Sequence, residues 1–269
     1  MTLRSRIFLC LIAGIFVAGI GAFFARNYLG QMINAYVAQA TEKELGSQSL
    51  NSDQEAKIKN IAVEIGITEP IIIRKMNQKA MITFGYHNAF AYFPLLLTFI
   101  PTNSSPYLFI SEGFLEDLSP EEQRFLIGHE MVHIKERHTL YLNLVLYSLF
   151  LLLAALAYFL TKRIQRLAQG LQYQKYIMGG ASGVLVFICL SITNIIGLAY
   201  RKHIEKVADC QSLKILKSYE GCTKLVTRWQ KEFNLPAHNP CYGLFSDHPS
   251  CEERKLYCKE MQNNSKETV

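Results

Sequence analysis

The chain has 269 residues, half of them hydrophobic, and 19% of its residues are charged, with a net charge of +6 at pH 7. This composition is typical of an integral membrane protein with one further folded domain. The basic residues are spread along the chain without a basic run interleaved with aromatic residues, which argues against a nucleic-acid partner and favours a lipid bilayer.

The first predicted element is an apolar segment at residues 7–25, close to the roughly 20 residues that a helix needs to cross a bilayer. Arg4 and Arg6 precede it and small residues lie at its end, so a cleaved signal peptide is an alternative. Its apolar stretch is longer than the roughly 7–15 residues of a signal-peptide core, which favours an uncleaved anchor within residues 1–25. A polar stalk helix is predicted within residues 26–50.

A second helix and a small sheet are predicted next. Residues 53–66 place their apolar side chains on one helical face. Turn residues then separate four strand-like segments, at 71–76, 80–86, within 90–100, and at 107–111. We therefore expect an α+β domain that is mainly helical and contains a small, mostly antiparallel sheet.

The following helix has a clear start signal. Ser119 precedes Pro120 and stands three positions before Glu122, which is the pattern of a capping box. The helix then contains the sequence HEMVH at residues 129–133. Its two histidines lie one turn and about 40° apart on a helix, so both imidazoles can bind the same metal ion.

The glutamate of this motif completes a hydrolytic pattern. His129 and His133 alone leave a zinc ion short of ligands, because a catalytic zinc site has three protein ligands and an open position. Glu130 lies on the flank of the same face, where its carboxylate can take a proton from a water and return it to a leaving amine. On the motif alone, a charged helix end at a membrane surface remains an alternative.

Two further spans are predicted at residues 139–160 and 177–200. With the anchor, they would place residues 26–138 and 201–269 on one side of the membrane. The loop at 161–176 contains basic residues and no acidic residue, so the positive-inside rule predicts that it is cytoplasmic. The two larger segments would then be extracytoplasmic, although Arg201 and similar basic residues near the span ends on their side weaken the signal.

The catalytic motif is predicted to lie close to the bilayer. The second span begins only six positions after His133. An unbroken helix would hold the metal roughly 10 Å from the lipid surface.

The C-terminal segment begins with two carboxylates. Glu205 and Asp209 lie one helical turn apart just after the third span. Glu205 could supply the missing metal ligand, and Asp209 could accept the spare N–H of a ligating imidazole. Taken alone, two carboxylates among lysines are more typical of a solvated helix surface, and this alternative stays open.

Cysteines are concentrated in the same segment, at Cys210, Cys222, Cys241, Cys251 and Cys258. This density is typical of an oxidising compartment. The last two lie about 10 Å apart if their stretch is helical, which is too far for a bond between them. Each would need a partner elsewhere, and free thiols are the alternative.

These motifs together resemble the M48 zinc metallopeptidases, a family that includes HtpX-like and Oma-like membrane proteases. The family's HExxH and ExxxD motifs match residues 129–133 and 205–209, and its NAFA segment matches residues 88–91. His248, Pro249 and Arg254 are similar to its HPxxxxR motif, and the resemblance covers roughly residues 50–260.

The resemblance implies a gluzincin-like fold with one zinc ion per chain, held by His129, His133 and Glu205. It further implies that Glu130 is the general base, that His248 stabilises the oxyanion, and that Arg254 orients neighbouring groups. Substrate would add as an extra strand at a sheet edge, where Asn88, Ala89 and Phe90 are candidate contacts and residues 107–111 a suitable strand.

The predicted function is a membrane-anchored zinc endopeptidase that cleaves membrane-proximal or misfolded envelope proteins. A protease dedicated to one substrate and a noncatalytic adaptor or holdase are the alternatives. The peptidase domain would comprise residues 51–138 and 201–269, separated by a transmembrane hairpin at 139–200. HtpX-like members have two N-terminal spans and face the cytoplasm, whereas one N-terminal span here predicts a periplasmic site at a bacterial inner membrane. A mitochondrial inner membrane and the oligomeric state stay open.

Overall fold

A computed structural model describes most of the chain beyond residue 49. The described residues are 50–76, 89–92, 95–96, 100–101, 105–111, 113–170, 172–232 and 248–267. The predicted anchor at 7–25, most of the stalk, the strand at 80–86, Asn88 and Cys241 lie outside them. The chain divides into two compact units, and the described parts of these are residues 143–197 and residues 50–142 with 198–267.

The first unit contains most of helix α6 (His138–Leu167) and the N-terminal half of helix α7 (Gln174–Leu216). Both are apolar and long enough to cross a membrane, with mean hydropathies of 2.3 and 2.1 in their most apolar windows. Large apolar side chains such as Leu151, Phe159 and Phe187 are exposed along them. A Cβ added at Gly197 would lie 2.9 Å from Leu146, so the two helices pack closely there. The helices include two of the three predicted spans.

The second unit contains a three-stranded sheet made of β1 (Ile72–Met76), β2 (Ala89–Tyr92) and β5 (Tyr107–Ser111), in the order β1-β5-β2. β5 pairs antiparallel with β2 but parallel with β1, so the expectation of a mostly antiparallel sheet is wrong. About 30 residues separate β1 from β5, so no tight turn forces these neighbours to run antiparallel. A separate two-stranded ladder joins β3 (Leu95–Leu96) to β4 (Ile100–Pro101).

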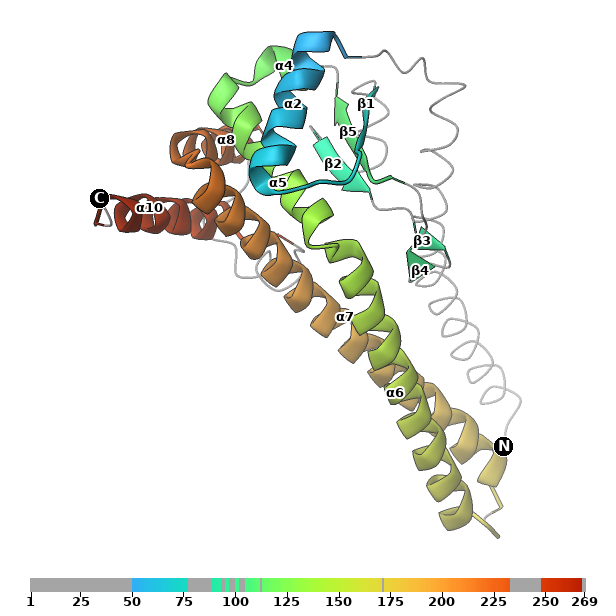
Figure 1. The fold of residues 1–269 in the computed structure, drawn as a ribbon. Helices are drawn as coiled ribbons and strands as arrows, with labels where there is room; N and C mark the ends of the chain where they lie inside the picture. The colour runs from blue at the N-terminus through green and yellow to red at the C-terminus, as the bar shows by residue number, and fades with distance from the viewer. Residues whose placement is uncertain are drawn as a thin grey trace. The chain divides into compact units, whose positions relative to one another are not determined.

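Helix α5 (Pro120–Lys135) lies at the centre of this unit and packs against α2 (Ser52–Ile65), α8 (Tyr219–Glu232) and β2 (Figure 1). Its predicted capping box is confirmed, because Ser119 and Glu122 each accept a hydrogen bond from the other's backbone N–H. A Cβ at Gly221 of α8 would lie 2.1 Å from the carbonyl oxygen of Glu121, so this contact requires glycine. Phe125 and Met131 of α5 and Leu225 of α8 are fully buried.

The chain breaks its helical path between α5 and α6. α5 ends at Lys135, Arg137 has a left-handed backbone with φ of 50°, and α6 begins at His138. The expectation of an unbroken helix from the HEMVH motif into the second span is therefore wrong. A residue with a left-handed backbone ends the hydrogen-bond pattern of a right-handed helix. The third span and the helix that follows it, in contrast, form one continuous helix, α7.

The last helix, α10 (Cys251–Glu267), packs against α8 and is joined to it by a disulfide between Cys222 and Cys258. This pairing agrees with the expectation that Cys258 and Cys251 do not bond to each other. Among the described cysteines, Cys189, Cys210 and Cys251 are free. The short helix α4 (Phe114–Asp117) follows β5.

Candidate metal centre

Two helices of the second unit bring three candidate ligands together. His129 and His133 come from α5 and Glu205 from α7. The two Nε2 atoms lie 3.0 Å apart, and Glu205 oxygens lie 3.3 Å from Nε2 of His129 and 3.4 Å from Nε2 of His133. Ligand atoms at about 2.0–2.1 Å from a tetrahedral zinc ion are roughly 3.3 Å from one another. The donor set therefore fits zinc in both chemistry and spacing.

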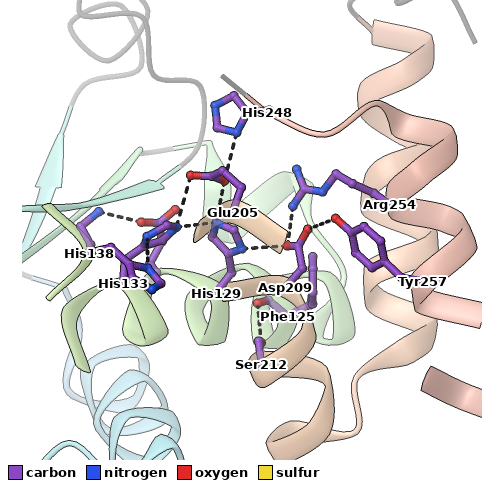
Figure 2. Close-up of polar contacts among 12 residues, drawn as sticks. Phe125, His129, His133, His138, Glu205, Asp209, Ser212, His248, Arg254 and Tyr257 are labelled. Carbon is purple, nitrogen blue, oxygen red and sulfur yellow. Dashed lines mark hydrogen bonds and ion pairs between the residues drawn. The ribbon is translucent and has the colours of Figure 1, made fainter. Parts of the chain in front are cut away.

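Asp209 lies one turn beyond Glu205 on α7 and holds the outer side of His129. Its Oδ1 is 2.8 Å from Nδ1 of His129, the ring nitrogen that does not face the other ligands (Figure 2). The carboxylate is fully buried. A carboxylate in this position fixes the ring orientation and makes Nδ1 the protonated nitrogen, which leaves the Nε2 lone pair for a metal.

The same carboxylate is held by two side chains of α10. Arg254 donates from Nη2 to Oδ1 of Asp209 over 2.6 Å, and the hydroxyl of Tyr257 donates to Oδ2. The guanidinium of Arg254 also stacks over Trp229, 5.0 Å from the ring centroid. Arg254 thus contacts Asp209, and the same carboxylate oxygen contacts His129.

His248 approaches the site from the loop before α10. Its Nδ1 lies 3.0 Å from Oε2 of Glu205, and its side chain is 55% exposed. The residue therefore sits at the open side of the three ligands, where it contacts the carboxylate ligand directly (Figure 2).

Glu130 is buried between α5 and the sheet. Its Oε2 accepts a hydrogen bond of 2.7 Å from the backbone N–H of Ala91 in β2. Burial raises the pKa of Glu130 to about 7, with the positive charge of His129 opposing this shift. A carboxyl with a pKa near neutrality is well matched to giving and taking protons at physiological pH.

The pKa values of the two histidines are shifted in opposite directions. Burial lowers the pKa of His129, but the carboxylates of Asp209 and Glu205 outweigh it and raise the value to about 10. Burial lowers the pKa of His133 to about 3, and Glu205 opposes this only in part. Protonation therefore competes with metal binding more strongly at His129 than at His133.

The sheet edge beside Glu130 is β2. Within the described residues β2 pairs on one side only, with β5, and it contains Ala89 and Phe90, whereas Asn88 lies outside them. β5 is paired on both sides, so residues 107–111 cannot accept a substrate strand and that expectation is wrong.

Sequence reasoning missed two residues that contact the site. Tyr257 lies three positions after Arg254 on α10, a spacing that places both on one helical face and could have indicated it. His138 contacts His133 only because the helix breaks between them, and no spacing rule for a regular helix would have found it.

In a comparison with protein families, residues 48–260 match the model described as peptidase family M48. Among solved structures, the crystal structure of S. mikatae Ste24p is similar, with a TM-score of 0.60 and 16% identity. The likeness covers 92% of this chain and 58% of that one, so the chain spans little more than half the length of Ste24p. No curated protein matches the chain.

Proposed function

The chain belongs to peptidase family M48, and from this premise we propose that it is a membrane-anchored zinc endopeptidase with a gluzincin-type site. The observation that carries the proposal is the convergence of His129, His133 and Glu205, whose ligand atoms all lie within 4.8 Å of one another. One zinc ion per chain, bound to these residues, would supply a Lewis acid that polarises the scissile carbonyl and acidifies water.

Glu130 is the proposed general base. Its carboxylate takes a proton from the attacking water and returns it to the amine that leaves. Its raised pKa, about 7, suits both steps, because the carboxyl can exchange a proton at little free-energy cost near neutral pH. The backbone N–H of Ala91 holds one of its oxygens and so limits the directions in which the carboxylate can point.

His248 is the proposed donor to the negative charge that develops on the carbonyl oxygen of the substrate. Its contact with Glu205 places it beside the ligands, and its exposure leaves it accessible to a bound peptide. Stabilising this charge is commonly the largest electrostatic contribution in acyl transfer. Arg254 and Asp209 have the supporting task of keeping the His129 ring in position.

The proposed substrates are unfolded or membrane-proximal polypeptides. An extended chain would pair with the backbone of β2, which contains Ala89 and Phe90, and Asn88 remains a further candidate contact from the sequence. Backbone pairing accepts many side chains. The peptidase domain would comprise residues 51–138 and 201–269, with the hairpin at 139–200 in the bilayer.

We place the site on the periplasmic side of a bacterial inner membrane. The loop 161–176 has basic residues and no acidic residue, which favours a cytoplasmic location for that end of the hairpin. The disulfide between Cys222 and Cys258 supports an oxidising compartment for the peptidase domain, because such bonds are rare in the cytosol.

The test is cleavage of an unfolded reporter by the full-length protein purified in detergent. Wild type should cleave it, and a zinc chelator should abolish cleavage until zinc is restored. Glu130→Gln should reduce the rate about 10²–10⁴-fold, while Glu121→Gln, an exposed neighbour on the same helix, should not. Cleavage that survives the chelator, or that survives Glu130→Gln, would overturn the proposal.

The breadth of the substrate range can be tested with the same variant. Glu130→Gln should bind substrate without cutting it, so polypeptides captured in cells identify what the enzyme receives. Many captured membrane proteins would support a quality-control role, whereas a single captured protein would assign it to dedicated processing. Protein that is purified without zinc and cannot take it up would indicate an adaptor or holdase.

A further inference from the structure

His133 has a buried neighbour on the side of its ring that faces away from the other ligands. Its Nδ1 lies 2.9 Å from Nδ1 of His138, and the two rings meet edge to face with centroids 4.9 Å apart. His138 is 7% exposed, so water does not compete freely for this contact. In Figure 2, His138 lies beside His133, which is one of the three candidate metal ligands.

The contact depends on the break between α5 and α6. In a regular helix, residues five positions apart lie about 140° apart around the axis, so their side chains do not meet. Here α5 ends at Lys135, and the left-handed backbone of Arg137 turns the chain before α6 begins. An ion pair of 3.1 Å between Arg137 and Glu69 lies at this turn. The turn directs His138 back onto His133.

The chemistry of imidazole assigns a role to this neighbour. A neutral histidine has one N–H donor and one acceptor nitrogen. Nε2 of His133 faces His129 and Glu205, so it must be the acceptor if it is to bind a metal. Nδ1 then carries the proton and needs an acceptor, which for a metal-bound histidine determines both the tautomer and the ring orientation.

We propose that His138 is a positioning residue: its Nδ1 accepts the Nδ1–H of His133 and holds the opposite nitrogen ready for the metal. His138 thereby does for His133 what Asp209 does for His129. It is not itself a ligand, because it meets the side of the His133 ring opposite to Nε2. The inference rests on the proposed metal site.

Three substitutions separate this role from simple packing. The Oδ1 atom of asparagine can occupy nearly the position of a histidine Nδ1, whereas the carbonyl of glutamine lies one methylene further out. His138→Asn should therefore keep the acceptor, while His138→Gln and His138→Ala should lose it. His203→Ala is the matched control, because His203 is an exposed histidine on α7 outside the ligand set.

The measurement is the zinc affinity of each full-length, metal-free protein, by competition with a chromophoric chelator. We expect His138→Ala and His138→Gln to bind zinc about 10–100-fold more weakly, His138→Asn to stay within about threefold of wild type, and His203→Ala to be unchanged. Cobalt-substituted protein should show a changed visible spectrum in the Ala and Gln variants only. Unfolding temperatures of the metal-free proteins identify any variant that fails to fold.

Two results would overturn the inference. The first is unchanged zinc affinity in the Ala and Gln variants, and the second is an equal loss in Asn and Gln, since the position of the acceptor would then be irrelevant. These results differ from failure of the proposed function, because in that case wild type itself would not bind zinc.

Discussion

The two histidines of the HEMVH motif lie one turn apart on the same helix, yet they are supported in different ways. His129 donates to the buried carboxylate of Asp209, which is itself anchored to α10, whereas His133 contacts the uncharged ring of His138. The pKa of His129 is accordingly raised to about 10 by its carboxylate neighbours, while burial lowers that of His133 to about 3. The spacing of the motif thus brings the two Nε2 atoms together, whereas residues from other parts of the chain set the protonation of each imidazole.

The His129 side should be the more sensitive of the two to substitution, because it contains buried charges. Asp209 compensates Arg254, which is buried with it, so removing either leaves the other without its partner. Truncating one member of a buried ion pair costs more than removing a neutral acceptor. Each of the following predictions tests this difference, from the largest expected effect to the smallest.

Asp209→Ala should have the largest effect. It leaves Arg254 buried without its carboxylate, so we expect the free energy of unfolding to fall by about 3–5 kcal/mol. Zinc affinity should fall on the order of 100-fold, since His129 loses the acceptor of its Nδ1–H. Denaturant unfolding and chelator competition measure the two effects, with Asp117→Ala, an exposed carboxylate, as control. A larger loss of zinc affinity in His138→Ala than in Asp209→Ala would contradict the comparison.

Breaking the disulfide should weaken the His129 side indirectly. Cys222 and Cys258 are 36 positions apart in the sequence, and closing a loop of that length stabilises a fold by about 3–4 kcal/mol in the chain-entropy account. Cys222→Ser should therefore lower the unfolding temperature, and a reductant should do the same to wild type. Cys251→Ser, at a free cysteine of α10, the helix that contains Cys258, should not lower the unfolding temperature. A wild-type protein whose unfolding is insensitive to reductant would refute the prediction.

Tyr257→Phe should have a smaller effect on the same side. It removes one hydrogen bond to a charged acceptor, which is worth about 1.5–3 kcal/mol, but leaves Arg254 in place. We expect zinc affinity to fall on the order of tenfold, because Asp209 would hold His129 less firmly. Chelator competition on the purified variant measures the change. An unchanged zinc affinity would mean that Arg254 holds Asp209 in position without help from Tyr257.

Glu122→Gln should have the smallest effect and should not alter the zinc site. Burial raises the pKa of Glu122, but the hydrogen bonds from Arg228 and Ser119 outweigh burial and lower it. A lowered folded-state pKa means that the carboxylate stabilises the fold above about pH 4.5, and that this contribution is lost as pH falls through the folded-state value. We expect Glu122→Gln to cost about 1 kcal/mol at pH 7, and the difference from wild type to disappear in acid.

Denaturant unfolding at several pH values checks this prediction, with Glu121→Gln as the exposed control. The zinc affinity of Glu122→Gln should equal that of wild type. Suppose instead that the zinc affinity of Glu122→Gln falls as far as that of Tyr257→Phe. Any loss of stability would then weaken zinc binding, and the zinc affinities would not report how His129 and His133 are supported.

Local features of the site could be predicted from the sequence. The capping box at Ser119 and the placement of His129 and His133 follow from the geometry of one helix. The same holds for Glu205 and Asp209, which share one face of α7. Each of these depends on neighbours within a few positions, where helical periodicity is reliable.

Long-range features could not be predicted in the same way. The parallel pairing of β1 with β5 joins two strands that lie some 30 residues apart in the sequence, and local patterns do not determine their relative direction. The contact between His138 and His133 depends on the left-handed backbone of Arg137. Arginine does not favour this conformation, so the sequence does not indicate it. Tyr257 of α10 contacts Asp209 of α7 across 48 positions of sequence. Such contacts arise from tertiary packing and leave no periodic signal.

The most direct test of the central claim is to measure zinc content and reporter cleavage on one preparation of Glu130→Gln. The account predicts one zinc ion per chain, as in wild type, together with cleavage reduced by at least about 10²-fold, because the ligands are intact and only the base is lost. Wild-type cleavage by a zinc-loaded Glu130→Gln protein would contradict the assignment of the base. Wild-type protein that holds no zinc would contradict the metal site itself.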